Sequence, residues 1–245
     1  MEKNTEAIKR ISKYSEYYLY ETHLHTSQGS ACARSTGAEM ARAAKEYGYT
    51  GIVVTDHFYY GNTAVDRKLP WKQWVDKFCQ GYYDAKKVGD EIGLKVFFGW
   101  ESCYDAMEFL IYGLSPNWLL EHPEIRDCSV KQQYEMVHRD GGIVIQAHPF
   151  READYIERQV QYPDDVDGVE VLNISNGAKF GAGLCACSWD DMALEYAEKH
   201  GLHMTSGSDV HSVSMLGCGM AFNRRLESIE DFTHAIINDE GVLMY

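Results

Sequence analysis

The sequence predicts an α/β fold in one domain, and three observations support that prediction. Short apolar segments rich in β-branched or aromatic residues alternate with longer segments of strong helix formers. This order runs through all 245 residues without a repeat, a low-complexity stretch or a linker-like segment. Histidine and acidic residues recur directly after the strand-like segments. We therefore expect residues 1–245 to form a single domain, since one α/β barrel commonly has this length.

The predicted strands are short and apolar, as the buried strands of a parallel sheet are. They lie at residues 18–20, 51–54, 95–98, 142–145 and 169–172. Helices are predicted between them because strong helix formers are followed within two residues by a glycine that can end a helix. The predicted helices lie at residues 36–47, 70–91, 129–139 and 188–200.

Alternating strands and helices imply parallel strands joined by right-handed crossovers. Two architectures satisfy that order, an open doubly wound sheet and a closed barrel. In an open sheet the ligands gather near one switch point, whereas in a barrel the carboxyl ends of many strands converge over one axis. The candidate site residues run from His23 to His211, so the pattern favours a barrel.

Two motifs have a spacing that suits metal binding. Side chains two apart in a strand point to the same face, so His23 and His25 can bind one cation. The same argument applies to Asp209 and His211. Imidazole nitrogens and carboxylate oxygens together suit zinc, manganese or iron. Glu101, His57 and His148 lie at three other strand ends. The predicted metal ligands are therefore His23, His25, His57, Glu101, His148, Asp209 and His211.

The charge balance excludes one class of partner. A formal net charge of -14 and a pI near 5.1 argue against binding of long nucleic acids, which require clustered lysine and arginine. A small anionic substrate remains compatible with this charge if metal ions and a few arginines create a local positive patch.

The cysteines and the apolar pattern predict a cytoplasmic protein. Seven cysteines form an odd, irregularly spaced set, which is typical of reduced thiols and not of a disulfide framework. The first ten residues lack the apolar core of a secretory signal, and no run of about 18 apolar residues predicts a membrane span.

The motifs together resemble those of the PHP superfamily, the polymerase and histidinol phosphatase domains. The resemblance rests on their order along nearly the whole chain. The matching segments are His23-Leu24-His25-Thr26, Thr55-Asp56-His57, Gly99-Trp100-Glu101, Ala147-His148-Pro149 and Gly207-Ser208-Asp209-Val210-His211. This resemblance implies a distorted, TIM-like (β/α)7 barrel that holds two or three divalent metals.

The resemblance also implies a division of the ligands among the metals. One metal would be held by His23, His25, Glu101 and Asp209. Glu101 would bridge to a second metal that His148 also binds. A third metal would be held by His57 and His211.

Two positions depart from the family's pattern. Relatives with a full third site often carry a histidine six residues beyond the second histidine of the first motif, and that position is Ala31. Many relatives supply another histidine from the strand after the bridging glutamate, and residues 108–113 contain none. Glu108 either replaces this histidine or begins its strand facing solvent.

The expected chemistry is hydrolysis of a phosphate ester by a metal-bridging hydroxide. Two metals a few ångströms apart can lower the pKa of a bridging water and hold the attacking and leaving oxygens. Glu101 would space the metals, Asp209 would handle the proton, and His211 would protonate the leaving alkoxide if no metal holds it. Arg151, three residues beyond His148, is expected either to contact the phosphate or to form a surface ion pair.

Three further residues are candidates for roles around the site. Arg34, in the loop after the first strand, and Lys179 are predicted either to contact phosphate or to form surface ion pairs. Asp56 is predicted to orient a neighbouring imidazole without binding metal itself.

The function predicted from these observations is that of a metal-dependent phosphoesterase. Its substrate would be a small phosphorylated metabolite, such as histidinol phosphate or a nucleotide. Two alternatives use the same residues differently. The first is an amidohydrolase-type enzyme acting at a carbon centre, and the second is a PHP-like module that binds a ligand without catalysis.

Overall fold

A single sheet of nine strands organises the computed structural model, which describes residues 5–179 and 183–245. The strands are β1 (Tyr18–Leu24), β2 (Gly51–Val54), β3 (Lys95–Tyr104), β4 (Met107–Tyr112), β5 (Ile143–Gln146), β6 (Gly168–Asn173), β7 (His203–Gly207), β8 (Met220–Phe222) and β9 (Gly241–Leu243). The helices are α1 (Thr5–Ser12), α2 (Gly37–Tyr47), α3 (Trp71–Phe78), α4 (Gln80–Ile92), α5 (Pro116–Glu121), α6 (Val130–Arg139), α7 (Ile174–Lys179), α8 (Ser188–His200) and α9 (Ile229–Ile237).

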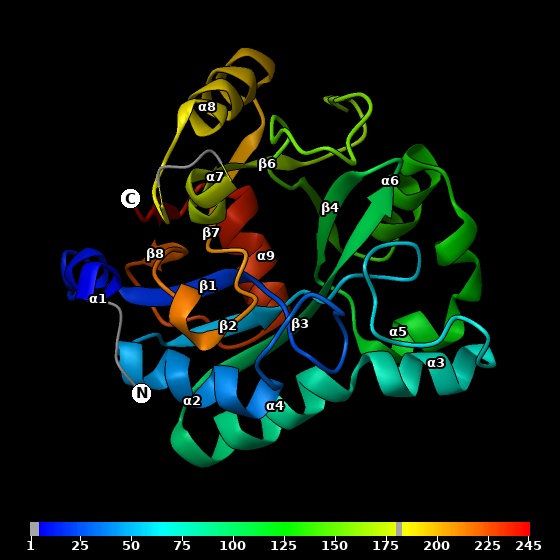
Figure 1. Ribbon diagram of the computed structural model, residues 1–245, viewed down its shortest axis with the longest axis horizontal. Coiled ribbons are helices and arrows are strands. Elements are labelled where there is room, and N and C mark those ends of the chain that lie inside the picture. Colours follow the sequence, from blue (N-terminus) through cyan, green and yellow to red (C-terminus); the bar gives the residue numbers. More distant parts are fainter. Residues whose placement is uncertain (1–4, 180–182) are drawn as a thin grey trace.

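The sheet curls into a nearly closed barrel, as the position of the ligands predicted (Figure 1). The strand order is β7-β6-β5-β4-β3-β2-β1-β8-β9. Thr22 Oγ1 in β1 donates a hydrogen bond of 2.7 Å to the carbonyl of Ser206 in β7. This contact brings β7, the first strand in the order, against β1 and nearly closes the barrel. Gly207 permits this approach, because a Cβ there would lie 2.8 Å from the Cβ of His23. The α/β barrel prediction is confirmed.

Two strands run against the predicted direction. The sequence predicts strictly alternating strands and helices, but β4 is antiparallel to both β3 and β5, and β8 is antiparallel to both β1 and β9. Asp105 and Ala106 connect β3 to β4 in a two-residue turn, and both have left-handed φ values of 48° and 65°. A tight turn of this type joins antiparallel strands, whereas a parallel connection needs a longer crossover. This hairpin accounts for part of the barrel's distortion.

The predicted helices are present with small changes at their ends. Helix α2 begins after Thr36, whose side chain accepts a hydrogen bond from the amide of Glu39 in a capping box. The long helix predicted at 70–91 is two helices, α3 and α4, which meet at Cys79. None of the helices that the structure describes is long and apolar enough to cross a membrane.

Helix α9 fills the end of the barrel that lies opposite the carboxyl ends of its parallel strands. Its Phe232 is fully buried and packs with ring centroids 5.3 Å from Tyr112 and 6.3 Å from Phe97. These aromatic rings and their aliphatic neighbours form a continuous core cluster at that end. The interior is therefore closed at one end, and the predicted ligands gather at the other.

Candidate metal centre

The seven predicted ligands converge at the carboxyl ends of the parallel strands. His23 lies within β1 and Glu101 within β3, while the other ligands follow the ends of their strands by a few residues. Every one of them is buried except His211, whose side chain is 23% exposed. Strands far apart in the sequence thus deliver imidazoles and carboxylates to one place.

Glu101 lies at the centre of this cluster and has no hydrogen-bonding partner among the residues that the structure describes. Its Oε1 is 3.1 Å from His23 Nε2 and 3.4 Å from His148 Nε2. Its Oε2 is 2.6 Å from His57 Nδ1, yet the geometry is not that of a hydrogen bond. A fully buried carboxylate is costly unless a positive charge neutralises it. Glu101 therefore fits a metal ligand surrounded by further ligands.

Asp209 connects the cluster to an arginine. Its Oδ1 lies 3.3 Å from His25 Nε2, and its Oδ2 accepts a hydrogen bond of 2.7 Å from Arg151 Nη2. Asp209 and His148 both have positive φ, at 54° and 28°. Residues held in such strained conformations concentrate at functional sites, where the surrounding structure enforces them.

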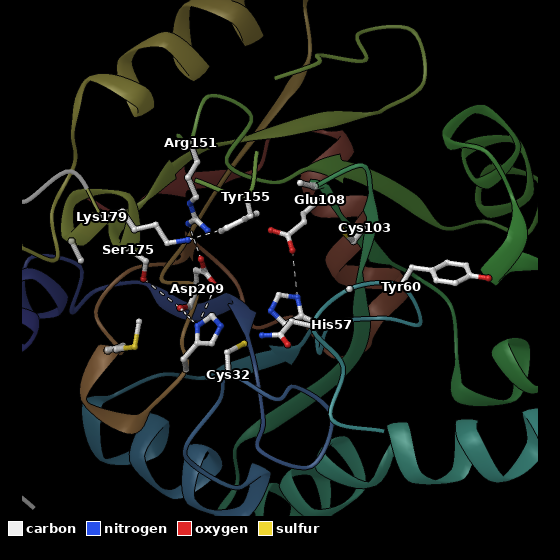
Figure 2. Close-up of a pocket in the computed structure, with 16 residues that line it drawn as sticks. Cys32, His57, Tyr60, Cys103, Glu108, Arg151, Tyr155, Ser175, Lys179 and Asp209 are labelled. Carbon is white, nitrogen blue, oxygen red and sulfur yellow. Dashed lines mark hydrogen bonds and ion pairs between the residues drawn. The ribbon is translucent and has the colours of Figure 1, made fainter. Parts of the chain in front are cut away.

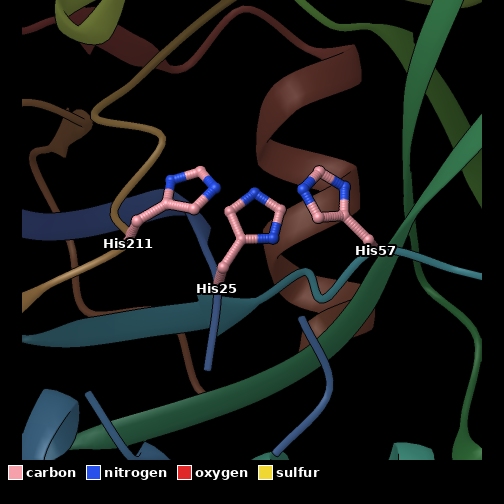
Figure 3. A group of neighbouring side chains, drawn as sticks. All are labelled: His25, His57 and His211. Carbon is pink, nitrogen blue, oxygen red and sulfur yellow. The ribbon is translucent and has the colours of Figure 1, made fainter. Parts of the chain in front are cut away.

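Four groups of donor atoms could each hold a metal ion, and they overlap. The groups are His23-His25-Glu101, His23-His148-Asp209, His57-Glu101-Glu108 and His25-His57-His211. The last is a row of three imidazoles in which the ring centroid of His25 lies 4.2 Å from that of His57 and 4.5 Å from that of His211 (Figure 3). The structure thus brings the predicted ligands together and adds Glu108 to them.

Glu108 points into the cluster and does not face solvent. Its carboxylate lies 3.4 Å from His148 Nε2 and 3.6 Å from His57 Nδ1. Burial and the neighbouring Glu101 raise the pKa of Glu108. Of the two alternatives weighed for this residue, its position fits the replacement for a missing histidine.

The electrostatics of the cluster favour a bound cation. Burial by itself would lower the pKa of His23, but Glu170, Asp209 and Glu101 raise it well above its ordinary value. Burial would likewise raise the pKa of Glu101, but the adjacent imidazoles lower it strongly. Glu101 therefore remains charged and attracts positive charge, which a divalent metal can supply.

Glu170 is a functional candidate that the sequence analysis missed. It lies in β6 with every neighbour in the strand buried, and its Oε1 is 2.9 Å from His23 Nδ1. Its Oε2 accepts hydrogen bonds from the amide of His148 and from Asn173 Nδ2. A carboxylate on the second nitrogen of a metal-binding histidine fixes its tautomer and orientation. The signal in the sequence was a single charged residue among the apolar residues 168–172.

Asp56 supports the cluster from the loop after β2. It accepts hydrogen bonds from Thr26 and from Ser30 Oγ, which in turn contacts His25 Nδ1 at 3.1 Å. Burial raises the pKa of Asp56 to about 6, although these hydrogen bonds act against the shift. Asp56 thus reaches His25 through Ser30, an indirect contact of the kind predicted for it.

A cavity of about 640 Å³ opens above the cluster and is lined in part by His57, Glu108, Asp209 and His211 (Figure 2). Arg151 and Lys179 also line it, and Lys179 Nζ lies 3.4 Å from Tyr155 Oη. Burial and the nearby Arg151 lower the pKa of Lys179.

Arg34 does not belong to this cavity. Its side chain is exposed, and it is absent from the residues that line the cavity. Of the three cationic candidates, Arg151 and Lys179 line the cavity beside the metal ligands, and Arg34 does not.

Cys32 also lines the cavity, although no pattern in the sequence singled it out. Burial would raise the pKa of its thiol, but hydrogen bonding to His211 and His57 lowers that pKa to about 6. The preceding residue, Ala31, is exposed on the surface. The cysteine, one position further along, is the side chain that reaches the cavity.

Comparison with known protein families finds one match, in the C-terminal part of the chain. Residues 188–240, which include Asp209 and His211, match a family described as PHP-associated. The chain matches none of the curated proteins.

Solved structures extend this similarity over most of the chain. The fold resembles that of a two-domain protein from Bacteroides vulgatus containing a predicted PHP-like metal-dependent phosphoesterase, with a TM-score of 0.64 and 15% identity. The similarity covers 92% of this chain and 64% of that one, so the chain spans less than two thirds of the relative's length. At 15% identity, this similarity shows a shared fold.

Two further structures share this fold over most of the chain. A proposed metal-dependent phosphoesterase from Bifidobacterium adolescentis is 16% identical with a TM-score of 0.55, covering 80% of this chain and 88% of that one. An amidohydrolase from Chromobacterium violaceum with bound sulfate is 13% identical with a TM-score of 0.51, covering 79% of this chain and 87% of that one. At these identities the similarity establishes the fold, and the chemistry must be argued from the site.

Proposed function

We propose that this protein is a metal-dependent phosphoesterase that hydrolyses a small phosphorylated substrate. One observation carries the proposal: Glu101, a buried carboxylate with no hydrogen-bonding partner among the described residues, lies among imidazoles beneath a cavity lined by Arg151 and Lys179. The carboxylates and imidazoles suit divalent cations, and the two cationic side chains suit the oxygens of a phosphate. A cavity of about 640 Å³ admits a metabolite and not a folded nucleic acid.

The residues that would hold the metals are those that the structure gathers at the strand ends. They are His23, His25, His57, Glu101, Glu108, His148, Asp209 and His211. When bound there, zinc, manganese or iron would make a coordinated water nucleophilic near neutral pH and would stabilise negative charge on the phosphoryl group.

The chain's own side chains have separate tasks in this proposal. Arg151 is fixed by Asn176 Oδ1 at 2.8 Å and by Asp209 at 2.7 Å, so its guanidinium is oriented before substrate arrives. It binds phosphoryl oxygens together with Lys179. Asp209, a carboxylate with a strongly lowered pKa, accepts hydrogen bonds and orients the groups around it.

His211 has two roles open to it. Its Nδ1 lies 2.9 Å from the carbonyl oxygen of Asp209, which fixes the ring and leaves Nε2 directed elsewhere. That nitrogen can protonate the leaving alkoxide or bind a metal.

The test measures metal content and phosphatase activity together. The purified protein, supplied with manganese, zinc or iron, is assayed on p-nitrophenyl phosphate and on a panel of small phosphomonoesters. Glu101→Gln is expected to lose bound metal and to reduce kcat at least about 100-fold. The substitution removes the negative charge of a residue that belongs to two of the groups of donor atoms. His203→Asn is the matched control, since His203 begins β7 at the end of the barrel away from Asp209.

Each alternative function has its own outcome in this experiment. Full metal content with hydrolysis of amides or lactams and of no phosphate ester would favour the amidohydrolase-type reaction. Bound metal with no turnover of either class would favour a binding module. Unchanged activity in Glu101→Gln would contradict the assignment of the site.

A further inference from the structure

His25 belongs to two groups of possible metal ligands, the imidazole row of His25, His57 and His211 and the group His23-His25-Glu101. His25 Nδ1 contacts Ser30 Oγ, so only Nε2 is free to bind a metal. That Nε2 lies 3.1 Å from His23 Nε2 and 3.3 Å from Asp209 Oδ1, within the adjacent group of ligands. One nitrogen lone pair binds one ion, so a metal between His57 and His211 needs a donor other than His25.

Cys32 is the side chain placed to supply that donor. It lies in the loop between β1 and α2, and its thiol makes hydrogen-bonding contact with the side chains of both His57 and His211. Figure 2 shows Cys32 beside His57, and both residues line the cavity. Cys103 also lines the cavity, but it makes no such contact with His211.

We propose that Cys32, His57 and His211 together form a metal site, with the Cys32 sulfur as its third protein ligand. This inference rests on the proposed function for the presence of metals, and it assigns His211 to binding and not to proton donation. Three protein ligands leave one position of a tetrahedral ion open, as in catalytic zinc sites. Cys32, His57 and His211 all line the cavity, so a phosphoryl oxygen bound there could reach an ion that they hold.

The donor set also predicts which metal the site selects. A thiolate with two imidazoles is softer than the carboxylate-rich groups around Glu101, Glu108 and Asp209. Soft ligands favour zinc over manganese, whereas carboxylates accept either. We therefore expect a chain loaded from a mixture of the two metals to retain zinc at Cys32.

Cobalt substitution provides a readout that does not depend on catalysis. The metal-free full chain is titrated with Co²⁺ and its near-ultraviolet absorption is recorded, because a cobalt–thiolate bond produces a charge-transfer band. The wild type and Cys103→Ser are expected to develop this band, and Cys32→Ser is expected to lack it. Elemental analysis should show that Cys32→Ser loses about one metal equivalent per chain.

A second variant keeps the test decisive if Cys32→Ser folds poorly. Cys32→His replaces the sulfur by a nitrogen donor, so it should regain the lost metal equivalent without the charge-transfer band. A band that persists in Cys32→Ser, or a wild type with a full metal complement and no band, would overturn the proposal.

The same data separate this inference from the proposed function. Phosphate-ester hydrolysis without a thiolate band would leave the function standing and refute the sulfur ligand. A thiolate band without hydrolysis of any phosphate ester would support the ligand and contradict the function.

Discussion

At the level of individual residues, acidic side chains at the strand ends are buried, and a buried carboxylate needs a positive charge nearby. Glu101 is almost fully buried, and neither of its oxygens has a hydrogen-bonding partner within the part of the chain that the structure describes. Without a metal, its charge is balanced by protons on the neighbouring imidazoles of His23 and His57, whose pKa values are raised. A carboxylate held in this way fits a site in which a metal ion replaces those protons.

Glu170 should control metal affinity without binding metal itself. Replacing it by Gln removes the negative charge beside His23 Nδ1 while keeping the shape of the side chain. Loss of such a supporting carboxylate is expected to weaken metal binding by about 10–100-fold. Competition with a chelator of known affinity measures this change. An unchanged affinity would show that Glu170 has only a structural role.

Arg151→Lys tests the phosphate contact with charge preserved. Lysine cannot reproduce the fork that reaches Asn176 and Asp209 at once, so the cation loses its fixed orientation. We expect KM for a phosphomonoester to rise roughly tenfold with the metal content intact. If this variant loses its metal instead, Arg151 acts mainly by holding Asp209 in place.

At the level of helices and strands, the β3–β4 hairpin brings Glu108 to the site. Its turn holds Ala106 at a φ of 65°, a conformation that costs an L-residue energy but suits glycine. The antiparallel direction of β4 gives the site a carboxylate from a strand that runs the opposite way to its neighbours.

Ala106→Gly should stabilise the protein because it relieves strain in this turn. We expect the free energy of unfolding to rise by about 0.5–1 kcal/mol, measured by urea denaturation of the metal-free protein. Ala153→Gly is the control, since Ala153 lies in a loop and has no positive φ. It should destabilise slightly, and a loss of stability in Ala106→Gly as well would contradict the strain argument.

The sequence predicted the features that depend on local pattern. Two-residue spacing placed His23 beside His25, and buried apolar runs located the strands. The direction of β4 could not be predicted, because Phe109, Leu110 and Ile111 would be equally apolar in a parallel strand. Cys32 and Glu170 escaped notice for a related reason: their importance comes from partners that only the fold brings near.

For the molecule as a whole, an acidic chain concentrates its site at one end of a barrel whose other end is filled by α9. The net charge of -14 repels anions at long range, so a phosphorylated substrate depends on local positive charge. Arg151, Lys179 and the bound metals would supply that charge inside the cavity.

Metal binding should therefore be linked to proton release across the cluster. The raised pKa values of His23 and His57 mean that these rings hold protons in the metal-free protein at neutral pH. A metal must displace those protons, so its apparent affinity should rise with pH, by roughly tenfold per unit for each proton displaced. His25 has a lowered pKa and is already neutral, so it releases none.

Calorimetric titrations in buffers of different protonation enthalpy measure this release between about pH 6 and pH 8. Glu170→Gln should release fewer protons, because Glu170 is the group that most strongly raises the pKa of His23. An affinity that does not change with pH would show that the imidazoles are neutral before the metal arrives.

The most direct test of the central claim is anomalous X-ray diffraction from crystals grown with zinc or manganese. We predict anomalous peaks among Glu101 and the strand-end histidines, and no such peaks in crystals of Glu101→Gln. Metal bound only elsewhere on the protein, or an ordered cluster that stays empty at saturating metal, would contradict the account.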